Sequence, residues 1–140
     1  MSKAAVVYWS STGNTEEMAK NVLEGAKAAG AEAQLFSTSD FSADKMDEFD
    51  AVAFGCSAMG DEELEETEFE PMFHECKEKL SGKRIALFGS YGWGDGEWMR
   101  KWEATCKEAG ADLVYESVIC ADAPDDDVKE NCRALGKALA

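Results

Sequence analysis

The feature that most constrains the fold is an apolar run, Ala4–Trp9, that ends abruptly in six small, uncharged residues at positions 10–15 (Ser-Ser-Thr-Gly-Asn-Thr). The run has the length of a buried strand covered on both faces. A helical pattern follows at once, with Met18 and Val22 on one face and acidic residues in its first turn. A strand, a small polar loop and a helix start predict a site where backbone N–H groups and hydroxyls converge on an anion.

The loop lacks a positive charge, because no lysine or arginine lies between Lys3 and Lys20. A Walker loop, G-x-x-x-x-G-K-[ST], requires a lysine at this point. We therefore expect a site for one terminal phosphate held by neutral dipoles. Its residues are Ser10, Ser11, Thr12, Gly13, Asn14 and Thr15.

The rest of the chain alternates apolar segments with helical patterns. Its 140 residues, 45% of them hydrophobic, suffice for one core, so we expect one domain over residues 1–140. Expected strands are Ala4–Trp9, Glu32–Ser37, Ala51–Cys56, Arg84–Ser90 and Leu113–Ile119. We expect a first helix that ends near Ala29 and a short helical turn at Ala43–Met46. Three more helices are expected: one from Pro71 through Leu80, one over Glu97–Ala109, and a last one that starts at Pro124–Asp125. This alternation predicts an open parallel sheet with helices on both sides.

The pattern leaves the strand order open. If the order is 2-1-3-4-5, the loops after the first, third and fourth strands meet at the carboxyl edge of the sheet. The loop after the fourth strand places Trp93 among glycines, where an indole can stack on a flat ring. The alternative is a surface tryptophan in a loose loop. The loop after the third strand offers Met59, which either covers an aromatic face or fills core space.

Three stretches together resemble the short-chain flavodoxins of anaerobic bacteria: Ser10-x-Thr12-Gly13-Asn14-Thr15, residues 56–63 and residues 88–98. The resemblance runs the full length of the chain. It implies a flavodoxin-like α/β fold of three αβα layers, with a five-stranded parallel sheet of order 2-1-3-4-5. It also implies non-covalent FMN as the cofactor.

The resemblance assigns roles to residues of the three loops. The FMN phosphate would lie on Ser10, Thr12, Asn14, Thr15 and Ser57, and Ser11 stands where glycine is usual. Met59 and Trp93 would lie on opposite faces of the isoalloxazine ring. Glu62 would accept from flavin N3–H, and backbone N–H groups around Gly92 and Gly94 would bind the pyrimidine edge. The Gly60–Asp61 peptide would turn its carbonyl toward N5, and the remaining site residues are Gly13, Ala58, Ser90 and Tyr91.

The implied function is that of a low-potential one-electron carrier, not an enzyme, which shuttles between the neutral semiquinone and the anionic hydroquinone. The FMN phosphate is a dianion with no cation nearby, so it disfavours the negative charge that the flavin ring carries in the hydroquinone. A flavodoxin-like NAD(P)H-dependent FMN or quinone reductase remains the alternative. A phospho-acceptor signalling domain is excluded, because it needs acids where Ser10 and Ser57 stand.

Composition bounds the partners. With 29 acidic against 14 basic residues, the net charge of −15 argues against nucleic acid and anionic membranes. The charge either attracts proteins with basic docking patches, which the resemblance implies are redox partner proteins, or serves only solubility. Seven acids lie in residues 61–70, where we expect screened surface charges. No signal peptide or membrane span is evident, so we expect a cytoplasmic protein, and we expect it to be a monomer. The five cysteines show no paired spacing and are expected to be free thiols, and His74 is expected on the surface.

Overall fold

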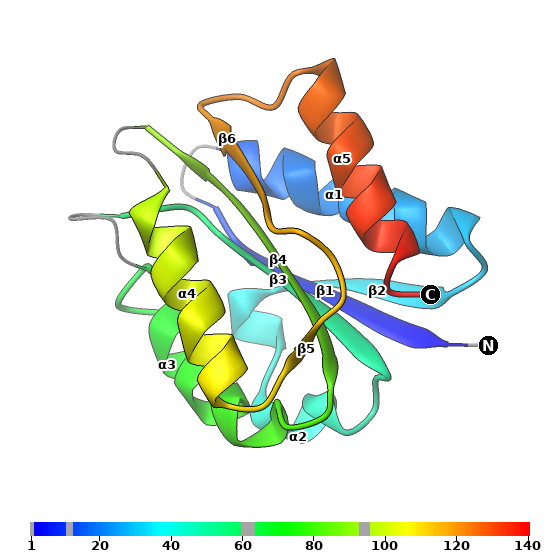
Figure 1. Cartoon of the computed structure of the whole chain (residues 1–140), viewed down its shortest axis with the longest axis vertical. Coiled ribbons are helices and arrows are strands. Elements are labelled where there is room, and N and C mark those ends of the chain that lie inside the picture. The colour runs from blue at the N-terminus through cyan, green and yellow to red at the C-terminus, as the bar shows by residue number, and fades with distance from the viewer. Residues whose placement is uncertain (1, 11–12, 60–63, 93–95) are drawn as a thin grey trace.

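The structure is a computed structural model that describes residues 2–10, 13–59, 64–92 and 96–140. Helices and strands alternate along the chain as the sequence pattern predicts (Figure 1). The strands are β1 (Lys3–Trp9), β2 (Glu32–Ser37), β3 (Ala51–Cys56), β4 (Arg84–Tyr91), β5 (Asp112–Leu113) and β6 (Val118–Ala121). The helices are α1 (Asn14–Ala28), α2 (Ala43–Met46), α3 (Phe69–Cys76), α4 (Glu97–Glu108) and α5 (Asp126–Lys137), with short 3₁₀ turns at Thr38–Asp40 and Lys77–Lys79.

The sheet has the order β2-β1-β3-β4-β5, and all its described pairs are parallel, which confirms the expected order 2-1-3-4-5. In the middle of the sheet, Val6 of β1 pairs with Leu35 of β2 on one side and with Ala53 of β3 on the other. All six residues of β3 are buried, as its continuous apolar sequence predicts for a central strand.

The expected fifth strand, Leu113–Ile119, is wrong as one continuous element. It forms two pieces, β5 and β6, and both pair with β4. Between the pairs Ile85–Leu113 and Phe88–Val118, β4 advances three residues while the edge chain advances five. Two residues are therefore in excess: Val114 still donates its N–H to the Ile85 carbonyl at 3.0 Å, and residues 115–117 leave the ladder. A break of this kind is tolerated at a sheet edge.

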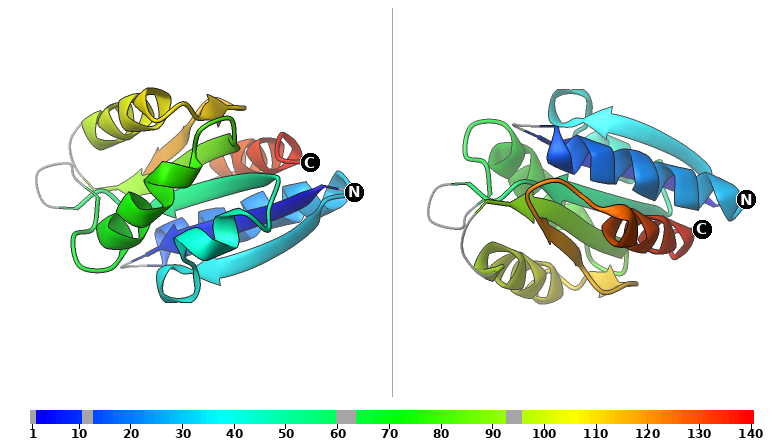
Figure 2. Two further views of the ribbon diagram at one scale, coloured as in Figure 1. Left: turned by 90° about the horizontal axis from the view of Figure 1, so that it is seen from below. Right: turned by 90° about the horizontal axis from the view of Figure 1, so that it is seen from above.

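Helices cover both faces of the sheet (Figure 2). Helices α1 and α5 pack together on one face over a core that includes Met18, Phe88 and Leu135. They approach so closely that a Cβ at Gly136 would lie 2.0 Å from the carbonyl oxygen of Val22. Helices α2, α3 and α4 cover the other face over a larger, aromatic core.

The ends of the helices follow local capping chemistry. The Asp125 carboxylate accepts the N–H of Val128 at 2.9 Å, so it starts α5 where the sequence predicts. Helix α3 ends at Cys76, and a 3₁₀ turn follows in place of the expected continuation to Leu80. None of the helices within the described ranges is both long and apolar enough to cross a membrane.

Candidate functional site

The residues that the sequence singles out come from the carboxyl ends of β1, β3 and β4, which meet at one edge of the sheet (Figure 1). The structure describes Ser10, Gly13, Asn14, Thr15, Ser57, Ala58, Met59, Ser90, Tyr91 and Gly92. Ser11, Thr12, Gly60, Asp61, Glu62, Trp93 and Gly94 lie outside the described residues.

The start of α1 is an open N-terminus. Gly13 precedes the helix with φ +94°, a backbone conformation that favours glycine, and no described side chain caps the helix. The Gly13 N–H donates to the Ser10 hydroxyl at 3.0 Å, which ties the start of α1 to the residue that follows β1. A helix start without a side-chain cap leaves first-turn N–H groups available for an anion.

Three buried hydroxyls join this helix start to the two other loops. Thr15 Oγ1 lies 2.7 Å from Ser57 Oγ and 2.9 Å from Ser90 Oγ, and the N–H of Ser90 also donates to Thr15 Oγ1 at 3.3 Å. Thr15, Ser57 and Ser90 are at most 5% exposed. The structure thus brings together side chains from segments more than 70 residues apart in sequence, Thr15 and Ser90.

The loops after β3 and β4 are also tied through the backbone. The Ala58 N–H donates to the Ser90 carbonyl at 3.0 Å. The next residue, Met59, is 37% exposed. Among the described residues, it is the large hydrophobic residue that lies exposed at the surface. An exposed methionine beside a polar loop suits contact with an aromatic face.

The far wall of this edge comes from β4, α4 and β6. The Tyr91 and Trp98 rings pack with centroids 5.4 Å apart. The N–H of Asp122 donates to the Tyr91 carbonyl at 2.8 Å, and Asp122 has φ +60°. The sequence pattern does not single out Asp122, apart from the tolerance of aspartate for the left-handed conformation.

Glu65 corrects the expectation that the acids of residues 61–70 are all surface charges. Its side chain is 7% exposed and accepts the N–H groups of Thr67, Glu68 and Phe69, together with the Thr67 hydroxyl. Burial alone would raise the pKa of Glu65, but these hydrogen bonds outweigh burial and lower it. Glu65 therefore caps α3 and fixes the segment between the loop after β3 and this helix.

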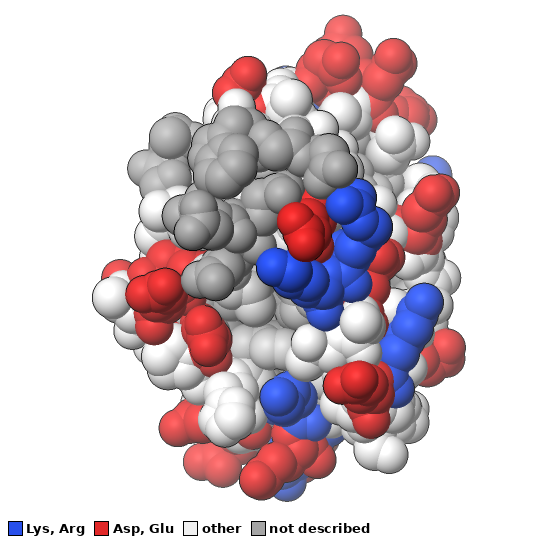
Figure 3. Space-filling model, turned by 60° about the vertical axis from the view of Figure 1, so that its left-hand side comes forward, with Lys and Arg blue, Asp and Glu red and all other residues white. Residues whose placement is uncertain are grey.

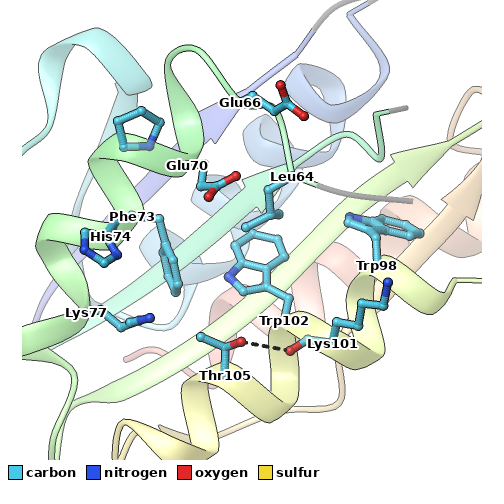
Figure 4. Close-up of a pocket in the computed structure, with 11 residues that line it drawn as sticks. Leu64, Glu66, Glu70, Phe73, His74, Lys77, Trp98, Lys101, Trp102 and Thr105 are labelled. Carbon is cyan, nitrogen blue, oxygen red and sulfur yellow. Dashed lines mark hydrogen bonds between the residues drawn. The ribbon is translucent and has the colours of Figure 1, made fainter. Parts of the chain in front are cut away.

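The largest described cleft lies elsewhere, between α3 and α4 (Figure 4). It has a volume of about 890 Å³, and Phe73, Trp98 and Trp102 contribute to its lining. The described site residues do not contribute to it. Ser10 and Gly13 instead line a second cleft of about 430 Å³, which also includes Tyr8 and Glu16. Burial, together with the hydrogen bond that Tyr8 donates to Glu16 at 2.9 Å, raises the pKa of Tyr8.

Comparisons with known proteins agree with this arrangement. The family model described as Flavodoxin matches residues 6–136. A flavodoxin from Clostridium beijerinckii is 45% identical over 135 residues, covering 96% of this chain and 97% of the relative. A flavodoxin from Megasphaera elsdenii is 42% identical and covers 96% of each chain. The solution structure of two-electron reduced Megasphaera elsdenii flavodoxin superposes with a TM-score of 0.89 and covers 97% of each chain.

The open parallel sheet and the polar loops at its carboxyl edge define an α/β protein of the flavodoxin-like fold, and the chain belongs to the flavodoxin family. Within the family it is of the short-chain type found in anaerobic bacteria. Flavodoxins carry FMN and transfer electrons to and from redox partner proteins, and they are not enzymes.

Proposed function

We propose that this protein binds FMN non-covalently, in one domain, and carries single electrons between partner proteins. When bound, FMN supplies the redox chemistry, cycling between the neutral semiquinone and the anionic hydroquinone. The observation that carries the proposal is the pair of hydrogen bonds that Thr15 makes with Ser57 and Ser90. These bonds hold the loops after β1, β3 and β4 together at one edge of the sheet.

The described residues fit the phosphate end of FMN. The start of α1 has no described side-chain cap, and a Cβ at Gly13 would meet no atom of the described residues within 4 Å. We assign the phosphate to Ser10, Thr12, Asn14, Thr15 and Ser57, with Ser11 and Gly13 shaping the loop. All these groups are neutral, so an added negative charge on the flavin meets no compensating side-chain cation in the loop.

The isoalloxazine ring belongs beyond the phosphate, between the loops after β3 and β4. Met59 supports this placement, because its exposed thioether lies beside Ala58, which is tied to Ser90. We assign Trp93 to the opposite face of the ring. Glu62, the Gly60–Asp61 peptide and backbone groups of Tyr91, Gly92 and Gly94 would bind the ring edge.

The surface charge supports steering toward basic partners. The net charge of −15 produces a long-range field that accelerates encounter with positive patches. Figure 3 shows acidic side chains in several groups over one face, with a smaller group of Lys and Arg side chains among them. We infer that the negative field of the protein attracts a basic partner protein. In the docked complex, both acidic and basic side chains of this protein would contact the partner. The protein would act as a monomer in the cytoplasm.

Titration of the apoprotein with FMN tests this function, with flavin fluorescence as the readout. We expect tight, stoichiometric quenching and a yellow complex. Addition of NADPH to that complex without another protein distinguishes a carrier from a reductase. A carrier keeps its oxidised flavin spectrum, whereas rapid bleaching by NADPH would indicate the reductase.

A further inference from the structure

The resemblance counts Ser90 among the cofactor-binding residues; we propose that it is instead a positioning residue for the FMN phosphate, which acts through Thr15 without touching the cofactor. The inference rests on the proposed FMN site. Ser90 lies on β4, on the far side of β3 from the phosphate loop, and its side chain is 4% exposed. Its hydroxyl and its backbone N–H both lie within hydrogen-bond reach of one atom, Thr15 Oγ1.

We assign a direction to these hydrogen bonds from the one donor that is fixed. A backbone N–H can only donate, so the Ser90 N–H occupies one lone pair of Thr15 Oγ1 at 3.3 Å. If the Ser90 hydroxyl at 2.9 Å also donates, both lone pairs of Thr15 are filled. The Thr15 oxygen can then accept no further bond, and its own proton must be donated outward.

Two groups can receive that proton. Ser57 Oγ lies 2.7 Å from Thr15 Oγ1, so in this assignment Ser57 accepts the Thr15 proton when no anion is present. A phosphate dianion is a stronger acceptor than a hydroxyl, and charge-assisted hydrogen bonds are about twice as strong as neutral ones. When phosphate binds, the protons of Thr15 and Ser57 both become available to it.

The buried setting strengthens this effect. Chained hydrogen bonds polarise one another, and a poorly solvated site increases each electrostatic contribution. Thr15 is fully buried, so water does not compete for its lone pairs. Ser90 thus makes Thr15 an obligate donor toward the anion, in the way that an outer-shell partner orients a ligand.

The phosphate dependence of flavin binding tests the proposal. Apoprotein is titrated with FMN and with riboflavin, which lacks the phosphate, for wild type, Ser90→Ala and Ser90→Cys. We expect Ser90→Ala to weaken FMN by about three- to tenfold, the range for one lost hydrogen bond, and to leave riboflavin affinity within about twofold. Ser90→Cys keeps a similar volume with a weak donor, so its FMN affinity should be intermediate.

The matched control is Ser117→Ala. The Ser117 hydroxyl is also hydrogen-bonded, to the Glu103 carboxylate at 2.7 Å, but it belongs to no loop of the site. This variant should leave both affinities unchanged. Thermal melting of the apoproteins in inorganic phosphate gives a second readout, in which Ser90→Ala should gain less stability from phosphate than wild type does.

Equal weakening of FMN and riboflavin by Ser90→Ala would overturn the proposal, since it would mark Ser90 as a general structural link. Unchanged FMN affinity would overturn it as well. If Ser90→Ala does not fold, Ser90→Cys decides by the same criteria. A wild-type apoprotein that binds neither flavin would overturn the proposed FMN site itself, whatever the variants do.

Discussion

The Glu65 carboxylate accepts the backbone N–H of Phe69, the first residue of α3, at 2.9 Å. The same carboxyl group also binds the N–H of Thr67 at 2.8 Å and that of Glu68 at 2.6 Å. Because α3 has no other described side-chain cap, we expect Glu65→Gln to lower the free energy of unfolding by about 1–2 kcal/mol. Urea unfolding of the apoprotein measures this change.

The neighbouring Glu66→Gln is the matched control for that prediction. It removes the same charge one residue further on, from an exposed side chain, and should change stability by less than about 0.5 kcal/mol. Equal effects of the two variants would show that charge, and not the cap, is responsible.

Glu65 also predicts a pH dependence. Its pKa is lowered in the folded state from an ordinary 4.5, so its contribution to stability is present above that value and is lost as the pH falls through the folded pKa. The stability difference between wild type and Glu65→Gln should therefore shrink below about pH 4.5. Unfolding curves between pH 7 and pH 3 measure this difference, and a constant or growing gap would contradict the assignment.

The contact between α1 and α5 predicts a reversal of the usual effect of glycine in a helix. Gly136 lies inside α5, where alanine normally stabilises by about 1 kcal/mol. Here a Cβ would lie 2.0 Å from the Val22 carbonyl oxygen and 2.8 Å from the Ala26 nitrogen, both backbone atoms. We expect Gly136→Ala to destabilise by about 1–3 kcal/mol in urea unfolding. A stabilised variant would mean that the two helices separate easily.

The five cysteines should be inert in the folded protein. All are free and buried, and burial raises the pKa of Cys56, Cys76, Cys106 and Cys132 to about 12 and that of Cys120 to about 11. The reactive thiolate is therefore scarce at neutral pH. A thiol assay at pH 8 should detect close to none of the five thiols in native protein and all five in denaturant. Fast reaction of any one in native protein would locate a locally open segment.

Local patterns were sufficient for much of the fold. Residues 4–9 and 51–56 form strands as expected because a continuous apolar run of that length is buried on both faces in a parallel sheet. The broken edge strand could not be predicted, because the departure of residues 115–117 from the ladder depends on their register against β4. That register is a long-range property of the sheet.

The candidate site shows the same division. Ser10–Thr15 is a local signal, since a small polar loop between a strand and a helix suggests anion binding wherever it occurs. The acids of residues 61–70 are identical in type, so nothing local distinguishes Glu65, the buried cap, from exposed Glu66. The Thr15–Ser90 contact likewise depends on strand order, which no single stretch of sequence contains.

Trp93 provides a test of the ring-binding end of the site. We expect Trp93→Ala to weaken FMN by about tenfold to a hundredfold, which corresponds to the ~1–3 kcal/mol typical of stacking on an aromatic side chain. Riboflavin should be weakened by the same factor, because the lost contact is to the ring. Fluorescence titration of the apoprotein measures both affinities, and unchanged values would remove Trp93 from the site.

The central claim is that the FMN-loaded protein carries one electron at a time, and an anaerobic reductive titration followed by absorbance tests it most directly. We predict two separated steps, with the long-wavelength band of the neutral semiquinone rising to a maximum after the first electron and disappearing with the second. Conversion of oxidised flavin to the fully reduced form in one step, without that band, would contradict the account.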